Sequence, residues 1–204
     1  VMVTRRGTIK RTQLSAYKNI RKSGLIAITL QEGDELAWVR VTTGSSELII
    51  ATRMGMAIRI EEKEIRPLSR SAMGVRAIKL RDGDEVVGMA RLREGATVMT
   101  VTDRGQGRRS DISDYRVQGR GGYGSINYRV NDVKGYVCGI KVVDETDDII
   151  LISNDGVIIR MHVSDINVMS RYASGVRVMR LSEDARVVTF ARAEREEETA
   201  LDDD

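Results

Sequence analysis

Apolar residues recur along the chain in short runs that end at a glycine, and this pattern occurs four times. The runs are VMVTRRG, LIIATRMG, VMTVTDRG and IILISNDG, ending at Gly7, Gly55, Gly105 and Gly156. A dipeptide turn containing glycine between two apolar runs is typical of a β-hairpin, and Asp-Gly at 155–156 is the clearest case. The pattern therefore predicts two antiparallel strands at the start of each repeat, for example over 149–153 and 157–161.

A second glycine marks a later point in every repeat. These glycines are Gly24, Gly74, Gly124 and Gly175, spaced by 50, 50 and 51 residues. A third strand is expected after this glycine, as over 25–30, 75–80 and 176–181. A polar turn then leads to a fourth strand, as over 36–41 and 86–92. Four strands in a repeat of about 50 residues are typical of propeller blades.

The sequence therefore predicts an all-β, propeller-like fold of four repeats with almost no helix. The expected blades cover residues 1–47, 48–97, 98–148 and 149–193. Residues 194–204 contain seven acids and one arginine. Their crowded like charge predicts a disordered acidic tail, because such a segment has little apolar surface to bury.

Repeats one and three differ from repeats two and four on one face of the second strand. The odd repeats carry Thr8, Lys10, Thr12 and Gln106, Arg108, Ser110, where the even repeats carry Met56, Ile58, Ile60 and Val157, Ile159, Met161. Because polar side chains favour water and apolar side chains favour the core, this alternation predicts that odd blades expose the face and even blades bury it.

Arginine recurs at two fixed positions in every repeat. One set follows the first glycine by four residues and comprises Arg11, Arg59, Arg109 and Arg160. It occurs whether the strand face is polar or apolar, which favours a structural role such as donating to carbonyls of the adjacent blade. The second set precedes the second glycine by three or four residues and comprises Arg21, Arg70, Arg120 and Arg171.

The charge of the chain changes when the acidic segment is set aside. The whole chain has 33 basic and 30 acidic side chains, a net of +3. Residues 1–193 have 32 basic and 23 acidic side chains, a net of +9. A basic body with an acidic tail is typical of proteins that contact nucleic acid. A surface simply covered by lysine and arginine remains the alternative.

Composition excludes several classes of protein. Hydrophobic residues make up 41%, which argues against wholesale disorder, and no apolar run approaches the roughly 18 residues of a membrane span. Charge follows residues 1–3 at once, so no signal peptide is expected. One cysteine and one histidine allow neither an internal disulfide nor a Cys/His metal site. We therefore expect a cytoplasmic location.

Two loops carry the candidate nucleic-acid ligands. In the loop RVQGRGGYG, Arg116 and Arg120 would contact phosphate, Tyr123 would stack or donate a hydrogen bond, and the glycines would allow close backbone approach. Glycines that merely shape a tight loop are the alternative. The loop of repeat one adds Lys18, Arg21 and Lys22, preceded by Lys10 on a strand. Arg108 of repeat three completes the basic set.

No catalytic constellation is present in the sequence. It contains no phosphate-binding Walker loop, no Ser/His/Asp motif and no dinucleotide-binding glycine fingerprint. We therefore expect no catalytic residue, metal ligand or cofactor site on this chain.

The third repeat resembles a known family. Gln118-Gly119-Arg120-Gly121-Gly122-Tyr123-Gly124 is similar to the seven-residue box of the DNA gyrase A C-terminal domain, Gln-(Arg/Lys)-Arg-Gly-Gly-(Arg/Lys)-Gly. ITLQEGDEL, VRAIKLRDGDEVVGM and ISNDGVIIRMHVSDI resemble the last four blades of that domain. Gly119 and Tyr123 stand where the full box has basic residues. By this resemblance, Gln118, Arg120, Gly121, Gly122, Tyr123 and Gly124 become candidate DNA ligands.

The resemblance implies a β-pinwheel from a six-bladed parent, with two blades expected before Val1. It implies non-specific binding, bending and wrapping of double-stranded DNA on the outer rim, in support of ATP-dependent negative supercoiling. The parent would be a type II topoisomerase that uses ATP and Mg. Its gyrase A chain would pair with gyrase B in an A2B2 complex, associated with the bacterial nucleoid.

Two alternatives remain open at this point. One is the corresponding C-terminal domain of topoisomerase IV, which would act in decatenation and substrate selection. The other is a propeller that binds proteins, which would use exposed apolar or aromatic patches. The chain has only one Trp, six Tyr and one Phe for such patches.

Overall fold

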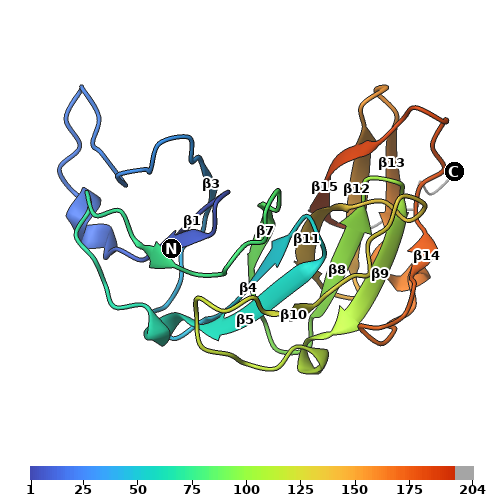
Figure 1. Ribbon diagram of the computed structural model, residues 1–204, viewed down its shortest axis with the longest axis horizontal. Helices are drawn as coiled ribbons and strands as arrows, with labels where there is room; N and C mark the ends of the chain where they lie inside the picture. The colour runs from blue at the N-terminus through green and yellow to red at the C-terminus, as the bar shows by residue number, and fades with distance from the viewer. Residues whose placement is uncertain (196–204) are drawn as a thin grey trace, which may run out of the picture.

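The computed structural model describes residues 1–195 of the 204-residue chain. Four antiparallel sheets follow one another along an open arc (Figure 1). The expectation of an all-β, propeller-like fold is confirmed. Within these residues, four single-turn 3₁₀ helices interrupt the strands: η1 (Leu14–Tyr17), η2 (Glu62–Glu64), η3 (Ile112–Asp114) and η4 (Val163–Asp165).

Each sheet is built on the hairpin that the first glycine of its repeat closes. The first sheet holds β1 (Met2–Thr4), β2 (Thr8–Lys10), β3 (Leu36–Val39) and β6 (Val75–Arg76). The second holds β4 (Glu47–Thr52), β5 (Met56–Glu61), β7 (Val86–Arg91) and β10 (Ser125–Ile126). The third holds β8 (Thr97–Thr102), β9 (Gln106–Asp111), β11 (Val137–Val143) and β14 (Val176–Arg177). The fourth holds β12 (Asp147–Ser153), β13 (Ile158–His162) and β15 (Val187–Glu194).

The third strand of a repeat joins the sheet of the preceding repeat. β6 pairs with β2, β10 with β5 and β14 with β9. Each exchanged strand has two residues, shorter than the six-residue strands expected from the sequence. Residues 25–30 form no strand, because the described chain offers them no earlier sheet edge to pair with. β13 keeps one unpaired edge, because no strand within residues 1–195 pairs with it in the place that β6, β10 and β14 take in the other sheets.

This exchange defines an inner and an outer side of the arc. The fourth strands, β3, β7, β11 and β15, lie at one edge of their sheets, and β11 packs against both β7 and β15. We call this concave side the hub (Figure 1). The exchanged strands β6, β10 and β14 lie at the opposite sheet edges, which we call the rim.

The expectation of exposed polar faces in the odd repeats is wrong. Lys10 and Arg108 are buried, with exposed fractions of 0% and 1%. Neither reaches the surface, so their assignment as DNA ligands is corrected. Lys10 Nζ donates to the carbonyls of Ala27 (2.6 Å), Ala72 (3.2 Å) and Arg70. Burying a cation costs several kcal/mol unless it is paired, and these carbonyls supply that pairing.

Arg108 occupies the equivalent place in repeat three. It donates to the carbonyls of Arg171 (2.5 Å), Ala173 (3.1 Å) and Asn127, and its Nε donates to Ser110 Oγ at 2.8 Å. Arg171 and Ala173 in repeat four correspond to Arg70 and Ala72 in repeat two. A buried cation of each odd repeat therefore holds the loop of the even repeat that follows.

The arginines four residues after the first glycine lie at the seams between repeats. The backbone carbonyls of Arg11, Arg59 and Arg109 accept hydrogen bonds from Leu68, Gln118 and Met169 of the next repeat. The side chain of Arg59 also donates to Ile112 O and Tyr115 O, both at 3.0 Å, and that of Arg11 donates to Ile65 O.

The side chains of all four arginines also pair with carboxylates, Arg59 with Glu47 at 2.5 Å and Arg11 with Glu62 at 3.7 Å. Arg109 pairs with Glu145, and Arg160 pairs with Asp148 at 2.8 Å. The backbone carbonyl of this recurrent arginine thus accepts from the next repeat at all three seams. The partners of its side chain differ from repeat to repeat.

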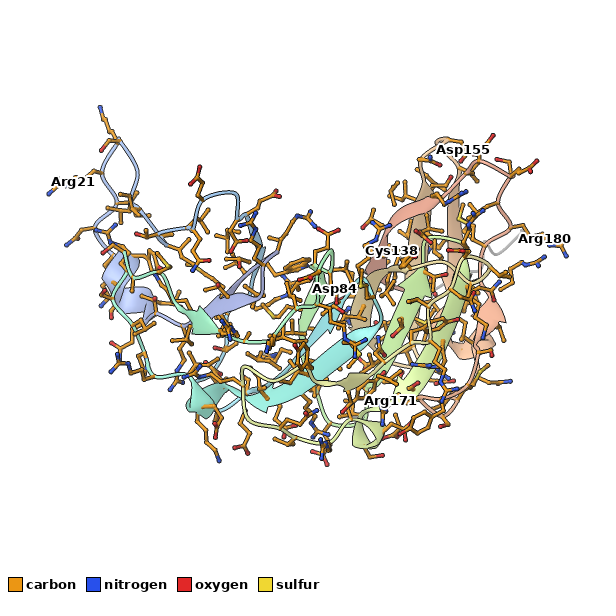
Figure 2. All side chains as sticks on the ribbon, in the orientation of Figure 1. Arg21, Asp84, Cys138, Asp155, Arg171 and Arg180 are labelled. Atoms are coloured by element: carbon orange, nitrogen blue, oxygen red, sulfur yellow. The ribbon has the colours of Figure 1, made fainter. Side chains whose placement is uncertain are left out.

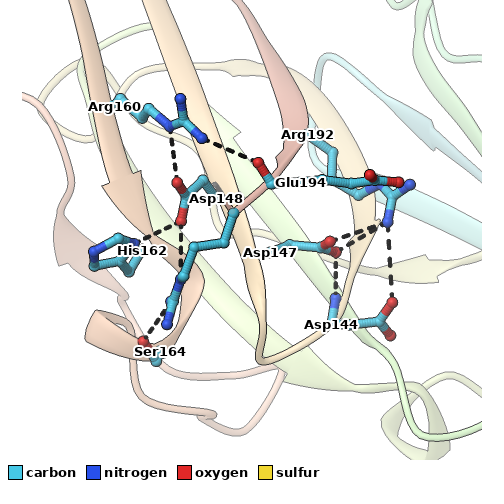
Figure 3. Close-up of polar contacts among 9 residues, drawn as sticks. Asp144, Asp147, Asp148, Arg160, His162, Ser164, Arg192 and Glu194 are labelled. Atoms are coloured by element: carbon cyan, nitrogen blue, oxygen red, sulfur yellow. Dashed lines mark hydrogen bonds and ion pairs between the residues drawn. The ribbon is translucent and has the colours of Figure 1, made fainter. Parts of the chain in front are cut away.

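The last repeat is held by a cluster of ion pairs (Figure 3). The buried carboxylate of Asp148 accepts from Arg160 Nε (2.8 Å), His162 Nδ1 (2.6 Å) and Arg195 Nε (3.4 Å). These partners lower the pKa of Asp148 to about 2, and the hydrogen bond from His162 is the largest cause. β15 extends to Glu194, so its strand runs one residue into the segment predicted as a tail. Arg195, the next residue of that segment, also bonds to Ser164 Oγ at 3.0 Å, and residues 196–204 of the prediction lie outside the described residues.

Candidate nucleic-acid interface

The loop 112–124 of repeat three crosses onto the sheet of repeat two. Its 3₁₀ turn begins where the Asp111 carboxylate accepts from the Ser113 N–H at 2.7 Å, which caps the turn. Further along, Gly121 N–H donates to Ala77 O at 2.6 Å, and Gly122 O accepts from Lys79 N–H at 2.8 Å. The glycine-rich part of the loop is therefore bonded to residues 77–79 along the rim.

Two of the loop glycines have a structural reason. Gly124 has φ +74°, and a Cβ there would lie 2.3 Å from Ala57 O of β5. Gly121 has φ +86°, and its N–H is already bonded to Ala77. The expectation that Gly121 offers its N–H to a phosphate is therefore wrong. Gly122 is exposed, and a Cβ added there would have no atom within 4 Å, so it stays a predicted point of close approach.

The side chains of Gln118 and Arg120 also bond within the protein. Gln118 Nε2 donates to Ser125 Oγ at 3.1 Å, and Arg120 Nη1 donates to Arg76 O at 3.3 Å. Arg70 and Arg171 make the equivalent bond, to Ile26 O (2.6 Å) and Ile126 O. These acceptors all lie two residues after the second glycine of the preceding repeat.

This arginine position therefore helps to hold the exchanged strand. Arg120 is nevertheless exposed, and its guanidinium has further N–H donors for phosphate. Its predicted role in DNA contact stays a prediction beside the structural one.

Tyr123 is 44% exposed and pairs with a cation that sequence reasoning missed. Lys79 Nζ lies 4.9 Å from the centre of the Tyr123 ring. Arg116 is exposed on the same loop. One rim loop therefore brings together an aromatic face and three cations. The cations are Lys79, Arg116 and Arg120.

The basic loop of repeat one projects at the far end of the arc. Lys18, Arg21 and Lys22 are exposed, and Figure 2 shows Arg21 pointing away from the body. None of the three forms an ion pair with another residue of the described chain. Their positive charge is therefore available to a polyanion.

A second missed set of cations recurs along the rim. Lys79, Arg129 and Arg180 each follow the second glycine of their repeat by five residues, and all three are exposed. Each lies three residues beyond an exchanged strand, and Figure 2 shows Arg180 at the outer surface. The sequence signal was the repeat register itself: a cation at this position occurs in three repeats, whereas repeat one has Thr29.

The arrangement suits a long anion rather than a compact ligand. Exposed cations follow the convex side of a curved molecule at intervals of one repeat. Within residues 1–195, no three His, Cys, Asp or Glu side chains are grouped to hold a metal ion. No helix in the same residues has both the length and the apolar character to span a bilayer.

Comparison with known proteins gives a consistent result. The family model for the DNA gyrase C-terminal domain, a β-propeller, matches residues 1–43, 46–93, 96–136 and 147–194. The A subunit of DNA gyrase from Clostridium acetobutylicum is 44% identical over 203 residues, which cover 100% of this chain and 24% of that protein. The same protein from Staphylococcus aureus, strain NCTC 8325, is 40% identical over 206 residues, with 100% and 23% covered. The chain thus spans about a quarter of the length of these relatives.

Solved structures share the fold. The C-terminal domain of a DNA topoisomerase IV matches with a TM-score of 0.89 and 28% identity, covering 95% of this chain and 61% of that one. A DNA gyrase A C-terminal domain matches with a TM-score of 0.84 and 24% identity, covering 94% and 64%.

Proposed function

Because the chain belongs to the DNA gyrase C-terminal domain family, we propose that it binds duplex DNA along its rim and bends the DNA around the arc. The observation that carries this proposal is the repeated rim cation at Lys79, Arg129 and Arg180. DNA presents phosphates at regular intervals, so cations repeated along a convex surface match a curved duplex. No pocket that would read base edges is required, which fits binding without sequence preference.

The rim loops add charge on the same path. Lys18, Arg21 and Lys22 extend it at repeat one, and Arg116 and Arg120 extend it at repeat three. Bending the duplex costs a few kcal/mol, which added phosphate contacts offset. Tyr123 offers an aromatic face beside the backbone contacts.

The relatives' names suggest the wider setting. As part of a gyrase A chain, the domain would wrap DNA so that a type II topoisomerase introduces negative supercoils. That enzyme would be an A2B2 complex with gyrase B that hydrolyses ATP and uses Mg in other segments. Its place would be the bacterial cytoplasm, in association with the nucleoid.

The likeness to the topoisomerase IV domain, with a TM-score of 0.89, favours a second candidate. In that setting the same rim would select crossed DNA segments for decatenation. Topology assays separate the two: a wrapping domain shifts the linking number of nicked circles after ligation, whereas simple segment capture leaves it unchanged.

The test is a salt titration of duplex binding by the whole chain. If six to eight phosphates are contacted, log K falls against log salt with a slope of roughly −5 to −7. Neutralising Lys79, Arg129 and Arg180 together to Gln should reduce that slope by about three, because each phosphate contact contributes roughly one. Arg91→Gln, at the hub, is the matched control and should leave the slope unchanged. A slope near zero in the unaltered chain would favour a protein-binding propeller instead.

A further inference from the structure

A second basic surface lies at the hub, on the concave side away from the rim. Five cations line a cavity of about 480 Å³ there: Arg40, Arg91, Arg93, Lys141 and Arg192. The remaining lining residues are apolar, and no Asp or Glu of residues 1–195 is among them. The hub thus concentrates positive charge in a concave space, whereas the rim distributes it along a line.

Every repeat supplies the cavity with a cation from its hub strand. Arg91 ends β7, Lys141 lies in β11 and Arg192 lies in β15, while Arg40 directly follows β3. These strands converge because each is the inner edge of its sheet. The convergence is a product of the blade arrangement and joins residues up to 152 positions apart in the sequence.

Two of the five cations are neutralised by neighbouring acids. Arg93 pairs with Asp144 at 2.9 Å, and Arg192 pairs with Asp147 at 3.1 Å (Figure 3 shows the latter). Arg40, Arg91 and Lys141 form no ion pair with a carboxylate in the described chain. Within residues 1–195, the guanidinium of Arg40 donates only to the carbonyl of its own neighbour, Val39, at 2.8 Å.

Two of these cations, Arg40 and Lys141, also disfavour each other. Burial lowers the pKa of the Lys141 ammonium, and the positive charge of Arg40 lowers it further. The Lys141 ammonium lies 5.9 Å from the centre of the ring of Phe190, which lines an adjoining cavity that Lys141 also borders. Like charges held together without a counter-charge are relieved by a bound anion, because the anion pairs with all of them at once.

We propose that the hub cavity binds a small polyphosphate, inorganic or nucleoside-linked, through Arg40, Arg91 and Lys141. Guanidinium groups bind phosphate oxygens bidentately, and an ammonium adds a point charge. The cavity falls within the roughly 300–1,000 Å³ range of small-molecule sites, and a DNA duplex is too wide to enter it. A polyphosphate can bridge cations from several repeats, whereas a monovalent ion cannot.

Such a ligand would act on the arc as a whole. It would tie the inner strands of different blades together and so oppose opening of the arc. Because it binds the folded form, it should raise the Tm, and the Tm should keep rising with ligand concentration above the Kd. This role is independent of DNA contact on the rim.

Isothermal titration calorimetry of the whole chain with sodium tripolyphosphate tests the proposal, with sodium sulfate at the same ionic strength as the reference. We expect one saturable site for tripolyphosphate and a rise in Tm. Arg91→Gln and Lys141→Met should each weaken binding about tenfold, the loss expected for a charge-assisted contact. Arg129→Gln removes the same charge on the rim and should leave the affinity unchanged. Titration with ATP separates the two sources: tighter binding than tripolyphosphate indicates a nucleoside-linked ligand, and equal binding an inorganic one.

Three results would overturn the proposal. One is no saturable binding, and another is an equal loss in Arg129→Gln, which would indicate diffuse attraction. The third is binding that develops only after residues 196–204 are deleted, which would assign the cavity to the chain's own acids. Measuring duplex binding by the same variants distinguishes the two functions. Arg129→Gln should weaken only DNA binding, and Arg91→Gln should weaken only polyphosphate binding. Circular dichroism and the Tm of each variant identify any loss of fold.

Discussion

Lysine and arginine occur both on the second strands of the odd repeats and along the rim. They are buried and bonded to the protein on the strands, and exposed on the rim. Lys10 and Arg108 point into the protein and donate to backbone carbonyls of the repeats they join. Arg129 and Arg180 lie on the surface with no protein partner in the described chain. The difference shows that the role of a cation in this fold depends on whether backbone carbonyls surround it. Where the next repeat brings carbonyls within reach, the charge stabilises a seam, and elsewhere it remains available to DNA.

The largest expected effect comes from breaking a seam. Arg108→Met should destabilise the chain by about 3–5 kcal/mol, because it leaves the carbonyls of Arg171, Ala173 and Asn127 without a donor in a buried site. Denaturant unfolding measures the change. Arg116→Met on the rim should stay within about 0.5 kcal/mol, as a surface substitution does. A small loss of stability with a large loss of DNA affinity in Arg108→Met would contradict the assignment.

The loop glycines provide a matched pair within one rim loop. Gly124→Ala should cost about 2 kcal/mol, because φ is +74° and the added Cβ would lie against Ala57 O. Gly122→Ala meets no atom within 4 Å and should leave stability unchanged. If Gly122 approaches DNA, its alanine variant weakens DNA binding at unchanged Tm. Equal Tm values for the two variants would be inconsistent with the close approach at Gly124.

Lowering the pH should weaken the stabilising ion-pair cluster of the last repeat. The folded pKa of Asp148 is about 2, below its usual value of 3.8, so its contribution is present above pH 3.8. That contribution is lost as the pH falls from about 4 to about 2. Asp148→Asn should lower the Tm by several degrees at pH 7 and flatten the acid side of the stability profile. An unchanged profile between pH 4 and pH 2 would exclude Asp148 as its source.

The smallest effect is expected from the acidic end of the chain. Residues 196–204 carry six acids and no base, and a tethered polyanion competes with DNA for a basic surface. Deleting them should strengthen duplex binding several-fold at low salt, and the gain should shrink as salt screens the charges. The deletion starts at residue 196 because Arg195 bonds to Asp148 and to Ser164 Oγ. Moving the six acids to the N-terminus controls for net charge alone.

The repeat register was readable from the sequence because turns depend on local chemistry. The glycines that close each hairpin have positive φ, which glycine adopts without strain, and they recur at nearly constant spacing. That spacing predicted four blades, and the same register contained the rim cations at Lys79, Arg129 and Arg180. Local sequence does not mark these cations as ligands, because each stands singly between two apolar residues and not in a basic or glycine-rich loop.

By itself, the sequence determined the all-β repeats, their hairpins and the basic body. Only the tertiary structure decided which cations are free. Lys10 reads as a surface residue because its strand is polar, yet carbonyls from 17 to 62 residues away surround its ammonium. Strand exchange is equally invisible locally, since β6 needs the edge of β2 and residues 25–30 find none. The physical reason is the same in both cases: hydrogen-bond partners supplied by another repeat decide whether a polar group is buried or exposed, and no local pattern encodes them.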